Sequence, residues 1–201
     1  MQEYDVVIVG SGPAGSSCAK ALKDEGHSVL VLEKAKLPRH KTCSGVLMGQ
    51  TQQLLKAYFG SNVQEEVYCE NRYIEADAIY EWTPERGFSP SVWELDKDGR
   101  SFPRTYLNVW RNKFDKWLLD QSGAASCEGT RVRWFDASGA IVKVHAQRVQ
   151  TNEPTEFGCK YLVGADGNAS TIRRLLADDS HDIQKKSSLS RAITSLNPSD
   201  Y

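Results

Sequence analysis

Two short apolar runs near the start of the chain flank a glycine-rich segment. Residues 5–9 and 28–32 are apolar without alternation, which is typical of strands buried on both faces of a sheet. Residues 13–22 between them have the composition of a helix, and Pro13 suits its first turn because the missing N–H would have no partner there. Gly26 is expected to cap the C-terminus of this helix. The pattern predicts a strand, a helix and a second strand parallel to the first, since such crossovers are right-handed.

The rest of the chain continues to alternate between helix-like and strand-like patterns. Apolar positions at helical spacing predict helices, whereas aromatic and β-branched residues interrupted by Pro and Gly predict short strands. Together they predict an α/β fold. In chain order we expect a loop over 34–45, a helix over 50–59, short strands within 67–110, a helix over 111–121, three strands over 130–149 and 156–164, a helix over 170–177 and the start of a strand over 189–196.

The glycine-rich segment, Gly10-Ser11-Gly12-Pro13-Ala14-Gly15, matches the pattern G-x-G-x-x-G. It follows a predicted strand, opens a predicted helix, and precedes a second strand that ends at the acid Glu33. In this motif Gly10 permits the tight turn, Gly12 lets the backbone approach a pyrophosphate, and Gly15 lets helix and strand pack closely. A turn that only packs a helix on a strand is the alternative, but the full context favours a binding site for an ADP-containing dinucleotide.

Two further groups would complete such a site. The N-terminus of the helix presents N–H groups and a positive dipole end to the phosphates. Glu33 accepts a hydrogen bond from a ribose 2′-hydroxyl and repels a 2′-phosphate, which disfavours NADP at this site. Spacing alone does not separate FAD from NAD.

Composition excludes several other classes of function. The 201 residues carry 25 basic and 26 acidic side chains, a net charge of -1, so no overall positive field attracts nucleic acid or anionic lipid. No apolar run is long enough for a transmembrane segment, and no cationic stretch of a secretory signal precedes the first one. The five cysteines lie far apart without a C-x-x-C pair, which argues against disulfides and a zinc site. We expect a cytoplasmic protein without a metal.

Two segments besides the fingerprint carry a family resemblance. Residues 38–47 form a basic loop that contains Cys43, Ser44 and Gly45, and residues 161–174 contain an Asp-Gly pair followed by arginines. With the fingerprint, they resemble the p-hydroxybenzoate hydroxylase-type FAD-dependent oxidoreductases, and within them the geranylgeranyl reductase-like branch. Residues 109–115 are a softer match, because helices of this kind in the family open with an Arg close to the flavin. The resemblance implies FAD as the cofactor, with NAD(P)H as the candidate electron donor.

The fingerprint and the resemblance together assign a set of residues to the cofactor. Asp166 is placed to hold ribityl hydroxyls or to cap the helix that follows it, and these roles are compatible. Arg39, Lys41 and Arg111 are candidates for pyrophosphate or ribose contacts, or are solvated surface charges. Cys43 has a thiol that touches substrate, or is one of several small residues that let the backbone approach the flavin. The cofactor-binding candidates are Gly10, Gly12, Pro13, Ala14, Gly15, Glu33, Lys34, Arg39, Cys43, Ser44, Gly45, Arg111, Val132, Asp166 and Gly167.

The resemblance also divides the chain. It implies a Rossmann-type FAD-binding domain over 1–64 and 100–180, a β-rich insertion over 65–99 that starts the substrate domain, and a truncated strand over 181–201. Members of the family are longer, and their later half supplies a third flavin motif of the Gly-Asp type that does not follow residue 174 here. The chain is therefore expected to be a fragment of a longer protein, one subunit of a split enzyme, or a shortened protein with another role.

The implied function is reduction of an apolar, prenyl-type double bond through bound FAD. Two alternatives remain: a flavin monooxygenase of the aromatic hydroxylase type, and a non-catalytic FAD-binding subunit that needs a partner chain to supply the missing half. The substrate is expected to be a small apolar or aromatic molecule. The sequence offers no evident general acid or base, so no catalytic residue is assigned.

Overall fold

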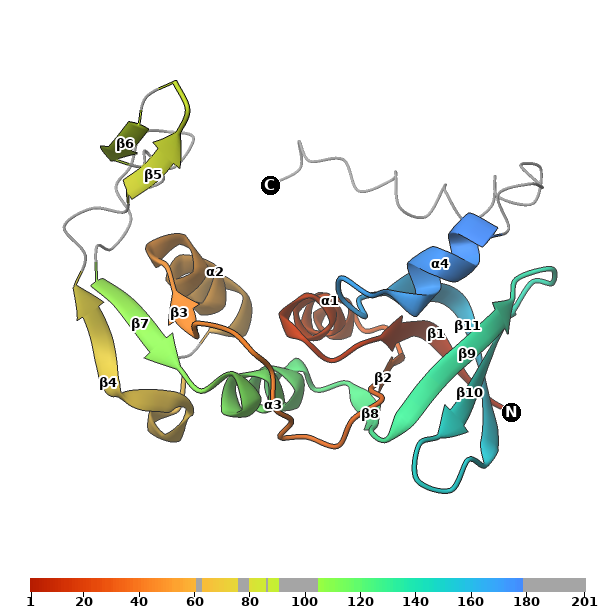
Figure 1. Cartoon of the computed structure of the whole chain (residues 1–201). Helices are drawn as coiled ribbons and strands as arrows, with labels where there is room; N and C mark the ends of the chain where they lie inside the picture. Colours follow the sequence, from red (N-terminus) through yellow and green to blue (C-terminus); the bar gives the residue numbers. More distant parts are fainter. Residues whose placement is uncertain (61–62, 76–79, 86, 91–104, 179–201) are drawn as a thin grey trace. The chain divides into compact units, whose positions relative to one another are not determined.

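The computed structural model describes residues 1–60, 63–75, 80–85, 87–90 and 105–178. It divides the chain into two compact units, Met1–Leu37 with Leu118–Tyr201 and Pro38–Trp117 (Figure 1), and each is described by itself. The second unit therefore holds the expected insertion together with segments on both sides of it. The strand expected over 189–196, like the truncated segment 181–201, lies outside the described residues.

The first unit is built on one six-stranded sheet, in the order β8-β2-β1-β11-β10-β9. Four neighbouring strands, β8, β2, β1 and the second part of β11, run parallel, whereas β9, β10 and the first part of β11 form an antiparallel meander. The strands are β1 (Gln2–Val9), β2 (Val29–Leu32), β8 (Ala125–Cys127), β9 (Thr130–Asp136), β10 (Val142–Arg148) and β11 (Pro154–Gly164). The parallel pairing of β1 with β2 confirms the expected strand–helix–strand unit.

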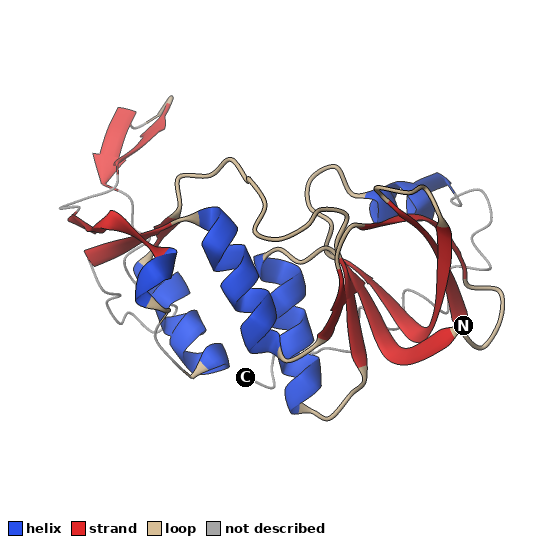
Figure 2. Ribbon diagram, turned by 90° about the horizontal axis from the view of Figure 1, so that it is seen from below, coloured by secondary structure: helices blue, strands red, loops and turns tan. Residues whose placement is uncertain are grey.

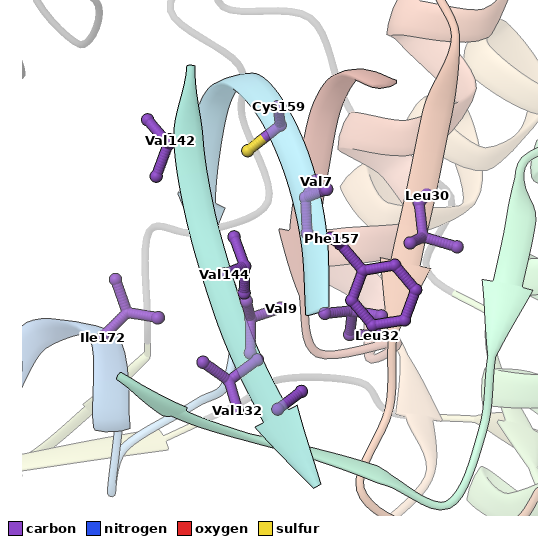
Figure 3. Close-up of a cluster of buried hydrophobic side chains, with 11 residues drawn as sticks. Val7, Val9, Leu30, Leu32, Val132, Val142, Val144, Phe157, Cys159 and Ile172 are labelled. Carbon is purple, nitrogen blue, oxygen red and sulfur yellow. The ribbon is translucent and has the colours of Figure 1, made fainter. Parts of the chain in front are cut away.

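Both faces of the parallel strands are covered, which explains why their sequences are apolar without alternation. Helices of the first unit lie on both sides of its sheet (Figure 2). On one face, Val6 and Ile8 pack with Ala19 of α1 (Pro13–Asp24) and with Leu119 of α3 (Arg111–Ser122). On the other face, side chains of β1 and β2 pack under the meander and α4 (Thr171–Asp178), as Figure 3 shows. The sheet is the centre of two apolar layers.

The second unit combines a small antiparallel sheet with helices and aromatic side chains. Its three-stranded sheet has the order β3-β7-β4, and β5 and β6 form a separate hairpin. The ring of Trp117 lies 5.7 Å from that of Phe59 and 6.1 Å from that of Phe114. The elements are β3 (Val46–Leu47), α2 (Gly49–Phe59), a 3-10 turn (Glu65–Val67), β4 (Tyr68–Glu75), β5 (Tyr80–Thr83), β6 (Gly87–Pro90), β7 (Thr105–Val109) and the first part of α3.

Most of the expected elements are present in the described residues, and their bounds lie close to the predicted ones. The strands β3 and β8 were not predicted, because runs of two and three residues carry no periodic signal. None of the helices in the described ranges is both long and apolar enough to cross a membrane.

Hydrogen bonds to the Asp5 carboxylate connect three strands of the first unit. The carboxylate of Asp5 on β1 accepts hydrogen bonds from the Ser28 N–H (2.9 Å) and hydroxyl (2.7 Å), just before β2, and from the Lys160 ammonium on β11 (2.7 Å). The bond from Lys160, followed by those from Ser28, lowers the pKa of Asp5 below its ordinary value. These interactions therefore stabilise the fold only while Asp5 is ionised.

We expect the acid sensitivity of the fold to depend on Asp5. Because the folded pKa is depressed, this contribution is present above the unfolded pKa of about 4 and is lost as pH falls through the folded value. Asp5→Asn should lower the urea midpoint near neutral pH, and the gap to the wild type should shrink as the pH falls below about 5. Urea titrations followed by circular dichroism across this range measure the gap; a gap that stays constant with pH would contradict the role of the carboxylate.

Candidate functional site

The glycine-rich turn after β1 lies against the chain that follows β11. The Gly10 N–H donates to the Leu32 carbonyl and the Ala165 N–H donates to the Val9 carbonyl, both at 2.8 Å. Gly10 has a φ of +105°, and a Cβ there would lie 2.4 Å from the Ala165 carbonyl oxygen. A Cβ on Gly15 would lie 1.9 Å from the Gly10 oxygen. The structure thus brings two of the motifs that carry the resemblance into direct contact, and both glycines have the roles expected of them.

The N-terminus of α1 opens at this edge of the sheet. Gly12 precedes the helix in an extended conformation, no side chain caps the first turn, and no acidic residue lies in it. Pro13 occupies the first turn as expected, and Pro13 and Ala14 are exposed. The carboxyl edge of parallel strands is where α/β folds bind ligands, and helix N–H groups at such an edge favour anions.

Glu33 lies buried beside the turn, with only 4% of its surface exposed. Its Oε2 accepts hydrogen bonds from the Ser11 N–H (3.1 Å) and hydroxyl (2.7 Å), and its Oε1 accepts one from the Ala35 N–H (3.0 Å). These donors fix the carboxylate at the end of β2. Ser11 was missed by the sequence analysis because it occupies a variable position of the motif; a hydroxyl residue between two glycines, with an acid after the next strand, was the available signal. Lys34, by contrast, is exposed.

Asp166 caps the helix that follows it. Its Oδ1 accepts from the Ser170 hydroxyl at 2.5 Å, and its Oδ2 accepts from the N–H groups of Thr171 (2.6 Å) and Ile172 (3.3 Å). The capping role is therefore present, while the contact with ribityl hydroxyls stays a prediction. Gly167 has a φ of +83°, and nothing lies within 4 Å of a Cβ built there, so its role in the turn comes from its backbone conformation.

Val132 does not present its side chain to a ligand. The residue lies on β9, is 4% exposed, and belongs to the apolar cluster of Figure 3. The side chain of Val132 belongs to the core, and a contact of this residue with the cofactor stays a prediction.

In the second unit, a buried carboxylate holds two of the predicted arginines. The Oδ1 of Asp115 accepts from the Arg111 Nε (3.1 Å) and Nη2 (2.8 Å), and the Arg39 Nη2 lies 3.3 Å from Oδ2. Partial burial works to lower the pKa of Arg111, but its bonds to Asp115 and Cys43 outweigh this effect and raise it. Neither arginine is simply a solvated surface charge. Lys41, the third candidate, is exposed.

The loop of Cys43, Ser44 and Gly45 is held against β7. Gly45 has a φ of +74°, and a Cβ there would lie 2.3 Å from the Val109 carbonyl oxygen. The glycine is therefore required by protein packing, whatever else approaches it. Cys43 is exposed. The pKa of its thiol lies below the usual range, first because the Gly45 N–H donates to the sulfur and further because Arg111 and Ser44 stabilise the thiolate, against an opposing effect of burial.

The candidates thus form two groups, each within its own unit. One comprises the glycine turn, Glu33 and Asp166 at the edge of the parallel strands; the other comprises Arg39, Cys43, Gly45 and Arg111, organised by Asp115. Asp115 was missed because helix periodicity alone did not distinguish it from an exposed acid. In the part of the chain that the structure describes, no cluster of His, Cys, Asp or Glu is placed to hold a metal ion.

A family model described as an FAD binding domain matches residues 3–197. A menaquinone reductase of Mycolicibacterium smegmatis is 30% identical over 183 residues, which is 88% of this chain and 41% of the reductase. The anhydrotetracycline hydroxylase OxyS of Streptomyces rimosus has a similar structure, with a TM-score of 0.66 and 26% identity over 88% of this chain and 34% of that one.

A geranylgeranyl bacteriochlorophyll reductase-like protein of Thermoplasma acidophilum shares the fold, with a TM-score of 0.62 and 20% identity over 83% of this chain and 40% of that one. The chain spans about two fifths of the length of the curated relatives that it matches.

The contact between Gly10 and Ala165 predicts a stability difference between two glycines. Gly26 also has a positive φ (+85°) but nothing within 4 Å of a Cβ. Gly26→Ala should therefore destabilise the fold by about 1–2 kcal/mol, from backbone strain alone. Gly10→Ala should lose about 1–3 kcal/mol more, because its Cβ displaces packed backbone. Urea denaturation measures the free energy of unfolding of both variants. Equal losses of stability would contradict the close approach of Gly10 to Ala165.

Proposed function

The chain belongs to the FAD-binding domain family, and we propose that it binds FAD where β1, β2 and β11 of the first unit end. The observation that carries the proposal is the contact of the glycine turn with Ala165. It unites the two motifs of the resemblance at the edge of the sheet that suits a dinucleotide. A turn that only packed a helix on a strand would not require the second motif.

Each group at this edge has a proposed role. The uncapped first turn of α1 donates N–H groups to the pyrophosphate, and Gly12 lets the backbone come close. Glu33 accepts a hydrogen bond from the adenosine ribose, with the Ser11 hydroxyl as the contact that exchanges for it. Asp166 orients the turn before α4 and meets the ribityl chain. The residues present fit the dinucleotide, because a fixed acid and unpaired helix N–H groups lie side by side.

FAD, when bound, supplies hydride or oxygen chemistry, and the protein contributes binding and orientation. We propose that the activity is reduction of a double bond in an apolar, prenyl-type substrate, with NAD(P)H as the donor. The menaquinone reductase at 30% identity supports this choice. Since the chain spans two fifths of that reductase, the substrate pocket is proposed to need the remaining part, on the same chain or on a partner.

A monooxygenase is the second candidate. The hydroxylase OxyS at 26% identity and a TM-score of 0.66 favours it. The proposed reductase and the proposed monooxygenase use the same FAD site and differ in what accepts the electrons. A test of FAD binding therefore applies to both, and a test of the electron acceptor distinguishes them.

FAD binding should depend on the charge of Glu33. The wild-type chain, mixed with FAD and desalted, should keep the visible flavin bands. Glu33→Gln should weaken FAD binding about ten- to hundredfold, because hydrogen bonds to charged groups contribute about 1.5–3 kcal/mol. Quenching of flavin fluorescence measures the Kd, and Glu25→Gln, at an exposed acid of the same unit, is the control. A folded wild-type chain that stays colourless after desalting and does not quench the fluorescence of added FAD would exclude an FAD site in this chain alone.

The electron acceptor separates the two candidates. A reductase is expected to lose electrons to air only slowly and to reoxidise its FAD on addition of a prenyl alcohol, which has a double bond to reduce but no quinone ring that would oxidise the flavin by itself. A monooxygenase is expected to reoxidise rapidly in air, with or without the prenyl alcohol. Stopped-flow absorbance of the dithionite-reduced, FAD-loaded protein, assembled with the remaining part, measures both rates, and rapid oxidation by air without an effect of the prenyl alcohol would rule out the proposed reductase.

A further inference from the structure

An exposed tryptophan lies on the outer face of the antiparallel meander of the first unit. Trp134 on β9 is 49% exposed. It lies directly opposite His145 on β10, and His145 lies directly opposite Glu156 on β11. Residues that face each other across antiparallel strands project from the same side of the sheet. The three side chains therefore form one row across the meander, on the side opposite to the apolar cluster of Figure 3.

The members of this row contact one another. The rings of Trp134 and His145 stack, with their centroids 3.6 Å apart and their planes at 11°. The His145 Nδ1 lies 2.8 Å from the Glu156 Oε1, and 52% of the Glu156 side chain is exposed. His145 thus covers one face of the indole. The rest of the indole and much of the Glu156 carboxylate remain accessible to a ligand.

A β-bulge places an arginine beside this row. The pairing of β10 with β9 shifts after His145, so that β9 has one extra residue there, Arg133. Arg133 and Trp134 are therefore both exposed although they are consecutive. The Arg133 Nε and Nη2 donate to the Gln147 Oε1 at 2.9 and 2.7 Å, and the Gln147 Nε2 donates to the Asn152 carbonyl at 2.8 Å. These bonds fix the direction of the guanidinium, and within the described residues its Nη1 donates no hydrogen bond.

A cavity of about 210 Å³ lies over this face of the meander. An apolar cavity of about 150 Å³ is large enough for benzene, so this one has room for a single ring with a short polar chain. Its wall combines an aromatic surface, a carboxylate and a fixed guanidinium. The lining includes Arg133, Trp134, His145, Gln147, Asn152 and Glu156.

We propose that this cavity binds a free aromatic amino acid in its zwitterionic form. The ring of the ligand stacks on the accessible part of Trp134, as aromatic pairs prefer. Its α-carboxylate pairs with Arg133, because a guanidinium fixed in direction recognises a carboxylate well. Its α-ammonium pairs with Glu156. A wall with one positive and one negative side chain favours a ligand that carries both charges over one that carries a single charge. The site is independent of the proposed FAD function.

The indole N–H resonance of Trp134 reports on binding at this place. It is assigned in the isotope-labelled chain by its absence from Trp134→Phe, and NMR follows it while L-phenylalanine is added. Phenylalaninamide lacks the carboxylate, N-acetylphenylalanine lacks the ammonium, and L-alanine lacks the ring. We expect L-phenylalanine to shift the resonance and each of the other three ligands to bind about tenfold more weakly or less.

Two variants assign the two charges. Arg133→Gln should weaken L-phenylalanine binding about tenfold and abolish the preference over phenylalaninamide. Glu156→Gln should weaken it similarly and abolish the preference over N-acetylphenylalanine, because each variant lacks the group that makes the distinction. Arg131→Gln and Glu153→Gln, at exposed residues nearby that do not line the cavity, are the matched controls and should bind as the wild type does.

A folded wild-type chain whose Trp134 resonance does not respond to L-phenylalanine overturns the site. Binding of phenylalaninamide or N-acetylphenylalanine as tight as that of L-phenylalanine overturns the zwitterionic ligand, and equally tight binding of L-alanine overturns the stacking on Trp134. Losses in the controls as large as those in the two variants overturn the assigned charges. If a variant does not fold, the comparison of ligands on the wild-type chain still decides.

Discussion

The parallel pairing of β1 with β11 is the interaction on which the candidate site depends. It aligns Val9 with Gly164, so that the turns after both strands emerge at one edge of the sheet. Gly10 then lies so close to Ala165 that no side chain fits between them. The pairing needs the meander behind it, because β11 reaches this position as the strand shared by the parallel and antiparallel parts of the sheet. Packing alone therefore requires a glycine at the first position of the fingerprint.

Carboxylates organise the candidate residues within each unit taken by itself. In the first unit, Glu33 accepts hydrogen bonds from Ser11 and Ala35, and Asp166 accepts them from the first turn of α4. In the second unit, Asp115 accepts hydrogen bonds from Arg111 and forms an ion pair with Arg39. Fixed acids and their partners need not reorganise when a ligand arrives, which is the advantage of a preorganised polar site. The chain belongs to the FAD binding domain family, and the fixed acids of the first unit suit the hydroxyls and phosphates of that cofactor.

The sequence predicted what depends on local patterns. The fingerprint, the parallel strands of 5–9 and 28–32 and the helix over 111–121 all follow from periodicity and glycine placement, and the fold class followed from them. What it missed depends on distant partners. Nothing near Val132 in the sequence indicates that β1 and β2 cover its side chain, and nothing near Asp115 indicates Arg39. Nothing near Gly45 in the sequence indicates that the carbonyl of Val109 would lie where its Cβ would be, and its approach to a flavin stays a prediction.

The contact of the two motifs implies that they respond to the cofactor as one site. Titrating FAD into the isotope-labelled chain, with backbone amide resonances followed by NMR, tests this directly. Amides of residues 10–16 (apart from Pro13) and 164–168 should shift together, with the same FAD dependence, and the amide of Glu33 should shift with them. A folded protein in which only one of the two segments responds, or in which neither does, would contradict a dinucleotide site at this edge of the sheet.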